Sequence, residues 1–194
     1  MYKRQICLDT QDTEEIIKTV VNIAPAFGGI NLEDISAPRC FEIESRLKEL
    51  LDIPVFHDDQ HGTAIVVLAG IINGLKVTGK TKEECKVVIN GAGSAGVAIT
   101  KLLLTYGFKN VTMCDKSGIL SKNSEGLNWM QKSMMDVTNL EGKTGSLADA
   151  LVGADVFVGV SAPNIVTADM VKTMNKDAII SVSYTHLRAH ETSL

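Results

Sequence analysis

A glycine-rich turn is the clearest chemical signal in the sequence. The pattern G-x-G-x-x-G directly follows an apolar stretch typical of a strand, Lys86 to Asn90, and opens an apolar stretch typical of a helix. In such a turn the first glycine makes the bend, the second lets backbone approach a pyrophosphate, and the third lets the helix pack closely on the strand. Free N–H groups and the positive end of the helix dipole then face the phosphates. The pattern predicts a dinucleotide site at Gly91, Ala92, Gly93, Ser94, Ala95 and Gly96.

An acidic residue at the end of the next predicted strand strengthens this interpretation. Asp115 lies 19 residues after Gly96, where a carboxylate can accept hydrogen bonds from the hydroxyls of the adenosine ribose. Such an acid favours NAD. The neighbouring Lys116 could instead pair with a 2′-phosphate, so NADP stays an alternative. The competing interpretation of the glycines is a turn with a purely structural role.

Two pairs of acidic residues form a second group with possible chemistry. Glu33-Asp34 and Asp58-Asp59 each follow a short predicted strand, Ile30 to Leu32 and Ile53 to Phe56. If these strands are parallel neighbours, their carboxyl ends meet at one edge, where a hard cation such as Mg²⁺ or Mn²⁺ would suit an all-oxygen ligand set. Acids after strands are also common helix N-caps, which is the alternative.

The elements that must position these residues alternate along the chain. Helical spacing is expected for Asp12 to Ile23, with Thr13 as N-cap, for Arg39 to Leu51, and for Thr63 to Leu75. The last of these lies in an uncharged run that is too short to span a membrane and is predicted to be a buried core helix. Beyond the polar stretch Lys76 to Glu84, strands and helices alternate, which favours a parallel sheet with helices on its faces.

Composition excludes several classes of protein. The chain has 194 residues, with 23 acidic and 19 basic residues and a net charge of −4, so the basic surface expected of a nucleic-acid-binding protein is absent. No secretory signal and no membrane-spanning segment are recognised. The four cysteines are far apart in the sequence, which is typical of free thiols in a reducing compartment, and we expect a cytoplasmic protein.

Three motifs, taken in order, resemble those of bacterial malic enzymes. They are Phe27 to Ile35, Phe56 to Ala64 and Gly91 to Gly96, and the resemblance extends over roughly Ile6 to Val182. It implies a Rossmann-type doubly wound parallel sheet over residues 79–182, preceded over residues 6–78 by part of the family's N-terminal α/β domain. Malic enzymes oxidise malate to pyruvate and CO₂ with NAD or NADP and Mg²⁺ or Mn²⁺, and they form homo-oligomers.

The resemblance also implies roles for individual residues. Glu33, Asp34 and Asp59 match the family's metal ligands, with Asp58 as a neighbour that orients them. Asp115 would lie at the ribose of the cofactor. A loop after a later strand would pass near the nicotinamide and contribute Ser161, Ala162 and Asn164.

The sequence also departs from the family. Nothing in it matches the catalytic lysine and tyrosine that transfer protons in malic enzymes, or the Asn-Pro segment expected after Val182. We therefore predict an internal fragment that does not turn over malate by itself, with non-native ends at residues 1–5 and 183–194. The alternatives are a related dehydrogenase of amino acids or tetrahydrofolate, and a non-catalytic dinucleotide-binding module.

Overall fold

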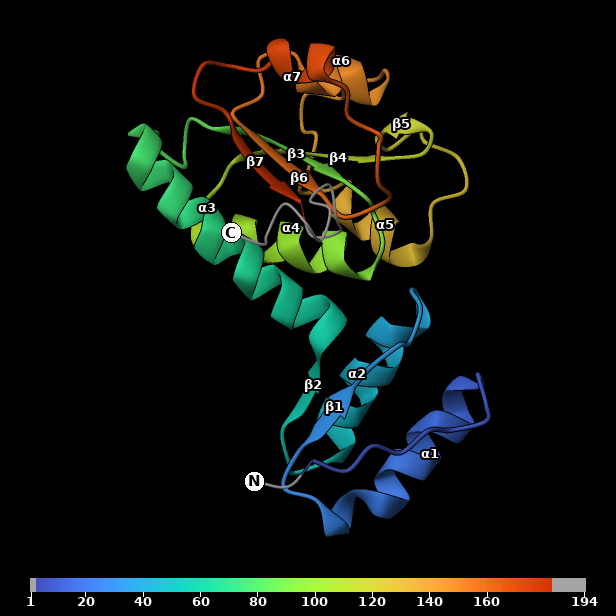
Figure 1. Ribbon diagram of the computed structural model, residues 1–194. Helices are drawn as coiled ribbons and strands as arrows, with labels where there is room; N and C mark the ends of the chain where they lie inside the picture. Colours follow the sequence, from blue (N-terminus) through green and yellow to red (C-terminus); the bar gives the residue numbers. More distant parts are fainter. Residues whose placement is uncertain (1–2, 183–194) are drawn as a thin grey trace. The chain divides into compact units, whose positions relative to one another are not determined.

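The protein divides into two compact units, Met1–Asp58 and Asp59–Leu194. The computed structural model describes residues 3–182, which are coloured in Figure 1. The ends expected to be non-native lie outside the described residues except for positions 3–5. The division into domains 6–78 and 79–182 stays a prediction.

The first unit pairs two helices with two short parallel strands. Its elements are α1 (Thr13–Ile23), a 3-10 turn (Ala24–Ala26), β1 (Ile30–Leu32), α2 (Arg39–Leu50) and β2 (Val55–His57). Its core is formed by aliphatic side chains that project from the helices and strands, among them Ile17, Leu32, Ile43 and Leu47. β1 and β2 are parallel neighbours, as the sequence predicts, and Leu32 is paired with His57.

Two local predictions in this unit are wrong. Asp12, not Thr13, caps α1, because its carboxylate accepts a hydrogen bond of 2.9 Å from the Glu15 N–H. The second strand begins at Val55 instead of Ile53. Pro54 has no N–H to donate to a ladder, and it contributes only its carbonyl, which accepts from Ile30 N at 2.8 Å.

The second unit begins within a π-helical turn, η2 (Asp58–Gly62). Its elements, in order, are α3 (Thr63–Thr78), β3 (Lys86–Asn90), α4 (Ser94–Tyr106), β4 (Asn110–Asp115), β5 (Gly118–Ile119), α5 (Trp129–Met134), α6 (Leu147–Leu151), β6 (Val156–Gly159), α7 (Ala168–Lys172) and β7 (Ile179–Val182). Its strands form one sheet in the order β5-β4-β3-β6-β7, and only β5 is antiparallel to its neighbour. The sequence missed β5, a two-residue strand too short for its pattern to be read.

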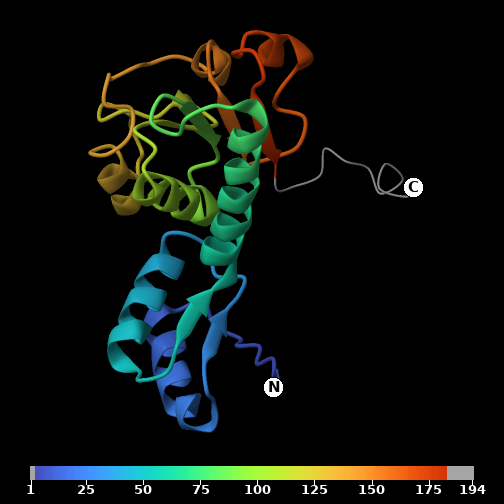
Figure 2. The same ribbon diagram turned by 90° about the vertical axis from the view of Figure 1, so that its left-hand side faces the viewer.

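Helices cover both faces of this sheet (Figures 1 and 2). α3 and α4 pack on one face, where Ile71 and Leu103 are fully buried. α6 and α7 lie on the other face, around Leu151 and Met174. The fold is therefore an α/β fold with a mostly parallel, doubly wound sheet, as expected.

α3 differs from the expected buried core helix. It continues to Thr78, where Gly79 ends it in a left-handed conformation with φ of 69°. One side of the helix is buried, but Val66 is 70% exposed and Val77 is 87% exposed. The sequence is apolar all round, whereas neighbouring elements cover only one side. By length and composition the helical stretch Asp58–Thr78 could cross a membrane, a property that the core helices of many soluble proteins share.

Candidate functional site

Three parallel strands of the second unit end at the same level. In the register of the sheet, Asn90 is opposite Cys114 on one side and opposite Gly159 on the other. The residues that follow, Gly91 and Asp115 among them, therefore lie along one edge. After β3 the chain turns to α4 on one face, and after β6 it turns to α7 on the other face. Such a switch point opens a crevice where α/β proteins bind ligands.

The glycine-rich turn is packed tightly at its first and third glycines. Gly91 has a φ of 120°, and a Cβ added to it would lie 2.8 Å from the carbonyl oxygen of Val160. A Cβ on Gly96 would lie only 1.7 Å from the carbonyl oxygen of Gly91. The Gly91 N–H also donates to the Cys114 carbonyl at 2.9 Å, so the bend is fixed to β4. These two positions need glycine for the reasons that the sequence pattern predicts.

The middle glycine faces open space. A Cβ on Gly93 would meet no atom within 4 Å, and Gly93 is the N-cap of α4 without any side-chain capping bond. The N–H groups of the first turn of α4, which begins with Ser94 and Ala95, are therefore not taken by a side-chain cap. This is the arrangement that an approaching phosphate requires.

A residue missed by the sequence analysis holds the turn from the other side. The Gln131 side chain on α5 donates from Nε2 to the carbonyl oxygen of Ala92 at 3.0 Å. α5 is itself fixed at its start by a capping box, in which Asn128 and Gln131 exchange hydrogen bonds. Only the tertiary fold brings Gln131, 39 residues further along, to the turn.

Asp115 is half-buried at the end of β4, beside the glycine-rich turn. Its Oδ1 accepts two hydrogen bonds from Ser117, from the backbone N–H at 2.8 Å and from the hydroxyl at 2.6 Å. These bonds fix the carboxylate, and no hydrogen bond from the described residues reaches its Oδ2. An acceptor oxygen is thus available at the position predicted to receive the ribose.

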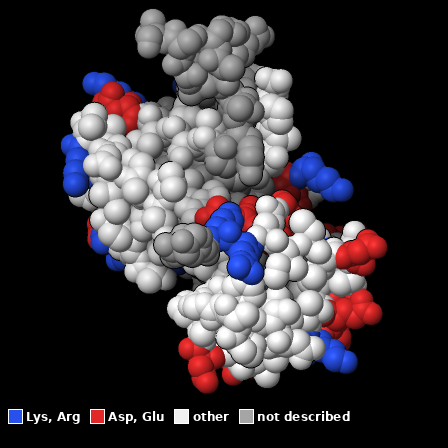
Figure 3. All heavy atoms as spheres, turned by 60° about the horizontal axis from the view of Figure 1, so that its bottom comes forward, with Lys and Arg blue, Asp and Glu red and all other residues white. Residues whose placement is uncertain are grey.

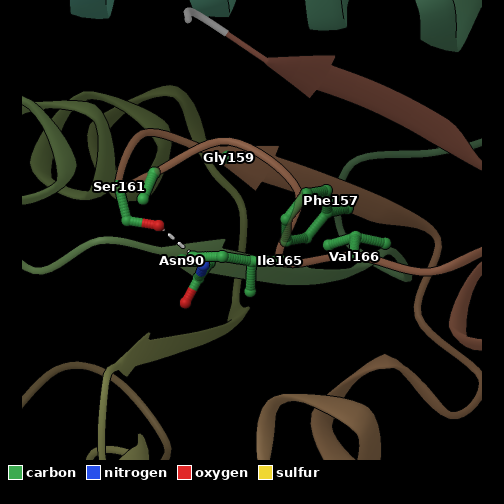
Figure 4. Close-up of a pocket in the computed structure, with 7 residues that line it drawn as sticks. Asn90, Phe157, Gly159, Ser161, Ile165 and Val166 are labelled. Carbon is green, nitrogen blue, oxygen red and sulfur yellow. Dashed lines mark hydrogen bonds between the residues drawn. The ribbon is translucent and has the colours of Figure 1, made fainter. Parts of the chain in front are cut away.

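The loop after β6 closes a small pocket against the end of β3 (Figure 4). Phe157, Ile165 and Val166 give it apolar walls, and Ser161 and Ala162 lie at its rim. Asn164 belongs to the same loop, is exposed and has a φ of 60°, and it does not line the pocket.

Asn90 is the second residue that the sequence analysis missed. It is only 4% exposed, and its Nδ2 donates to Ser161 Oγ at 2.8 Å. A signal was available, because a polar residue ends an otherwise apolar strand directly before the glycine-rich turn.

The acidic residues of the first unit follow β1 and β2. Because Leu32 is paired with His57, Glu33 and Asp58 come next on adjacent strands. Glu33 accepts a hydrogen bond of 2.7 Å from the Asn31 side chain. Asp34 has a φ of 57°, a left-handed conformation that is uncommon for residues other than glycine and that often occurs at functional sites.

The proposed metal ligands are not gathered into a cluster of three. Among residues 3–182, no group of three or more His, Cys, Asp and Glu side chains is arranged to hold a metal. Asp59 is the first residue of the second unit, whereas Glu33 and Asp34 belong to the first. Their carboxylate oxygens are the donor type that Mg²⁺ and Mn²⁺ prefer. The ring nitrogens of the adjacent His57 are buried without a hydrogen-bond partner in the described chain.

The described residues lend little support to a catalytic cysteine at the crevice or to a surface that binds nucleic acid. Cys114 lies beside the crevice, but burial and the nearby Asp115 carboxylate together raise the pKa of its thiol to about 12, so it is not a thiolate near neutral pH. Acidic and basic side chains are interspersed over the described residues visible in Figure 3, without a broad basic area on that face.

Known proteins resemble this chain closely. The family description "Malic enzyme, NAD binding domain" matches residues 60–182, and "Malic enzyme, N-terminal domain" matches residues 5–48. The NAD-dependent malic enzyme of Geobacillus stearothermophilus is 57% identical over 175 residues, and the bifunctional malic/malolactic enzyme of Bacillus subtilis is 52% identical over 176 residues. Each match covers 90% of this chain, which spans 37% of the first relative's length and 43% of the second's.

Solved structures agree with these sequence matches. The NAD-dependent malic enzyme from Thermotoga maritima superposes with a TM-score of 0.88 and 50% identity, covering 90% of this chain and 47% of its own. The malic enzyme of Entamoeba histolytica gives a TM-score of 0.87 and 36% identity over 97% of this chain and 42% of its own. With the NAD-binding description matching well over half of its residues, the chain belongs to the malic enzyme family of oxidoreductases.

Proposed function

We propose that this protein binds NAD or NADP at the carboxyl edge of β3, β4 and β6, and that it serves the oxidative decarboxylation of malate to pyruvate and CO₂. The observation that carries the proposal is the glycine-rich turn, in which Gly91 and Gly96 are sterically required while Gly93 opens toward the crevice. Membership of the malic enzyme family supplies the substrate. The relatives include NAD-dependent and NADP-dependent enzymes, so the experiment proposed below uses both cofactors.

Each part of the crevice has a task in this proposal. The N–H groups of the turn and of the first turn of α4 would bind the pyrophosphate. Asp115 would accept from the hydroxyls of the adenosine ribose through its open Oδ2. The loop bearing Ser161, Ala162 and Asn164 would lie along the nicotinamide side.

We further propose that Glu33, Asp34 and Asp59 hold Mg²⁺ or Mn²⁺, on the basis of their match to the family's motifs and of their oxygen donors. A bound divalent cation would supply Lewis-acid stabilisation of the negative oxygen that develops on the substrate. Asp34 has a left-handed backbone conformation, which is often found at functional sites, two residues after the end of β1. Asp58, next to the end of β1, would orient the ligands.

The chain has no residues that match the pair that transfers protons in malic enzymes. The family's lysine and tyrosine have no counterpart in the motifs described above. We propose that the 194-residue chain binds its cofactor but does not reduce it with malate. The competing function, a dinucleotide-binding module without catalysis, differs in having no response to Mn²⁺. We also propose that the full-length protein forms a homo-oligomer and is located in the cytoplasm.

The decisive experiment has two measurements on the purified chain. Fluorescence titration with NADH and NADPH reports binding, and absorbance at 340 nm with malate, Mn²⁺ and NAD or NADP reports turnover. Saturable binding without turnover supports the proposal, and turnover would refute the proposed inactivity. Calorimetric titration with Mn²⁺ of the wild type and of Glu33→Gln tests the metal, with Glu49→Gln on exposed α2 surface as the matched control. Equal Mn²⁺ affinity in all three proteins would refute the ligand assignment.

A further inference from the structure

The side chain of Asn90 occupies a position where a polar group is costly. It is 4% exposed at the end of the central strand β3, and it projects to the same side of the sheet as Phe157. Burying an amide without hydrogen bonds is unfavourable, so a residue retained there must be satisfied by specific partners. Its Nδ2 has such a partner in Ser161 Oγ, at 2.8 Å, shown by the dashed line in Figure 4.

The direction of this hydrogen bond constrains the serine hydroxyl. Because the Asn90 amide donates, Ser161 Oγ accepts, and the proton of the hydroxyl has to point elsewhere. No second hydrogen bond of the Ser161 hydroxyl within the described chain is found. Ser161 is exposed, so this proton is available to a bound molecule.

The backbone around the pair holds both residues at the glycine-rich turn. The Val160 N–H donates to the Asn90 carbonyl at 2.9 Å, and a Cβ on Gly91 would lie 3.0 Å from Ser161 N. The Ser161 hydroxyl therefore lies beside the bend where the pyrophosphate is proposed to bind. An acceptor oxygen of the phosphate–ribose part of a dinucleotide is the chemistry that fits an outward O–H donor at this place.

We infer that Asn90 is a positioning residue of the cofactor site: its amide orients the Ser161 hydroxyl so that Ser161 donates a hydrogen bond to the bound dinucleotide. This inference rests on the proposed function. Asn90 itself acts through Ser161, and the two side chains should behave as one unit.

A double-mutant cycle with NADH as the probe tests this coupling on the full 194-residue chain. Asn90→Ala and Ser161→Ala should each weaken NADH binding by about 3- to 10-fold, the size expected for one hydrogen bond. The double variant should bind no more weakly than the weaker single variant, because the amide has no effect once the hydroxyl is gone. Effects that multiply in the double variant would overturn the inference, as would wild-type affinity in Asn90→Ala.

Asn90→Asp distinguishes orientation from simple packing. An ionised carboxylate can only accept, so it would draw the Ser161 proton inward and weaken NADH binding at pH 8. As pH falls and the carboxyl becomes protonated, it can donate again, and affinity relative to Asn90→Ala should recover. The same pH dependence in both variants would contradict the proposed orientation.

A variant at the exposed serine protects the test against misfolding. Ser161→Thr keeps a hydroxyl and should restore most of the affinity that Ser161→Ala loses, while circular dichroism checks that each variant is folded. No rescue by threonine would count against the inference. Absence of NADH binding by the folded wild type would instead refute the proposed function itself, so the two failures are distinguishable.

Discussion

A single added methyl group should have very different effects on protein stability at two glycines of the same turn, Gly96 and Gly93. In Gly96→Ala the new Cβ would lie 1.7 Å from the Gly91 carbonyl oxygen, which is 1.3 Å closer than the 3.0 Å that real Cβ atoms respect. The backbone fixes the position of the Cβ, and the oxygen is itself a backbone atom, so no flexible side chain can move away. The start of α4 must move away from the end of β3.

The expected cost follows from this overlap. Overpacking in a well-packed region costs about 1–3 kcal/mol, and a backbone clash belongs at the upper end of that range. For a protein of this size, a loss of about 3 kcal/mol lowers Tm by about 6–12 °C. In Gly93→Ala the new Cβ meets no atom within 4 Å, so the stability should change by less than about 0.5 kcal/mol.

Cofactor affinity, unlike stability, should be sensitive to the added methyl group at Gly93. The methyl group of Gly93→Ala fills the position that the pyrophosphate would approach, and loss of a charge-assisted hydrogen bond there weakens NADH binding by about tenfold or more. Gly70→Ala, on the exposed side of α3, adds the same methyl group in open space and should leave NADH affinity unchanged.

Thermal unfolding followed by circular dichroism and NADH fluorescence titration measure the two effects separately. An unchanged Tm in Gly96→Ala would refute the steric reasoning about the third glycine. A stable Gly93→Ala that binds NADH as tightly as the wild type would refute the assignment of the middle glycine to the phosphate.

Three further outcomes are expected. Burial raises the pKa of Asp155, but hydrogen bonds from Lys80 Nζ, the Lys86 N–H and Asn175 outweigh it and hold that pKa below its ordinary value. Its contribution to stability is therefore present above about pH 4 and lost as pH falls through the lowered pKa, and Asp155→Ala should cost about 2–4 kcal/mol in urea unfolding at pH 7, with the difference from wild type shrinking as the pH is lowered below about 4. Iodoacetamide at pH 8 should label exposed Cys7 quickly and buried Cys114 only after unfolding, since burial raises the latter's pKa to about 12; equal labelling in mass spectra would contradict this. Asp115→Ala should weaken NAD binding by about tenfold and NADPH binding by less, because it removes the carboxylate proposed to accept from the ribose; an unchanged ratio of the two Kd values would refute that role.

Patterns that depend on neighbouring residues could be predicted from the sequence. The strand, glycine-rich turn and α4 were recognised because their residues follow one another and each glycine has its own steric reason. The place of Asp115 at the end of β4 could be predicted because it directly follows an apolar stretch typical of a strand. The mostly parallel sheet with helices on its faces is predicted by the alternation of strands and helices, and the family resemblance adds the doubly wound arrangement.

Contacts between distant residues could not be predicted in this way. Gln131 reaches the Ala92 carbonyl, and Asn90 reaches Ser161, only because the fold brings them together. The start of α1 is misplaced by one residue because neighbouring polar residues compete for the N-cap, and the Asp12 carboxylate, not the Thr13 hydroxyl, accepts from the Glu15 N–H. The exposure of Val77 depends on which neighbours cover α3, which its uniformly apolar sequence does not specify.

The two walls of the crevice are joined to β3 by strand pairings that span very different lengths of chain. Its pairing with β4 joins Lys86 to Asn110, whereas its pairing with β6 joins Val87 to Val156. Closing the longer loop costs about 1 kcal/mol more in chain entropy than closing the shorter one. The pairing of β3 with β6 therefore carries the larger entropic cost, and it is the pairing that supplies the second wall of the crevice. A ligand that spans the two walls would stabilise that long-range pairing.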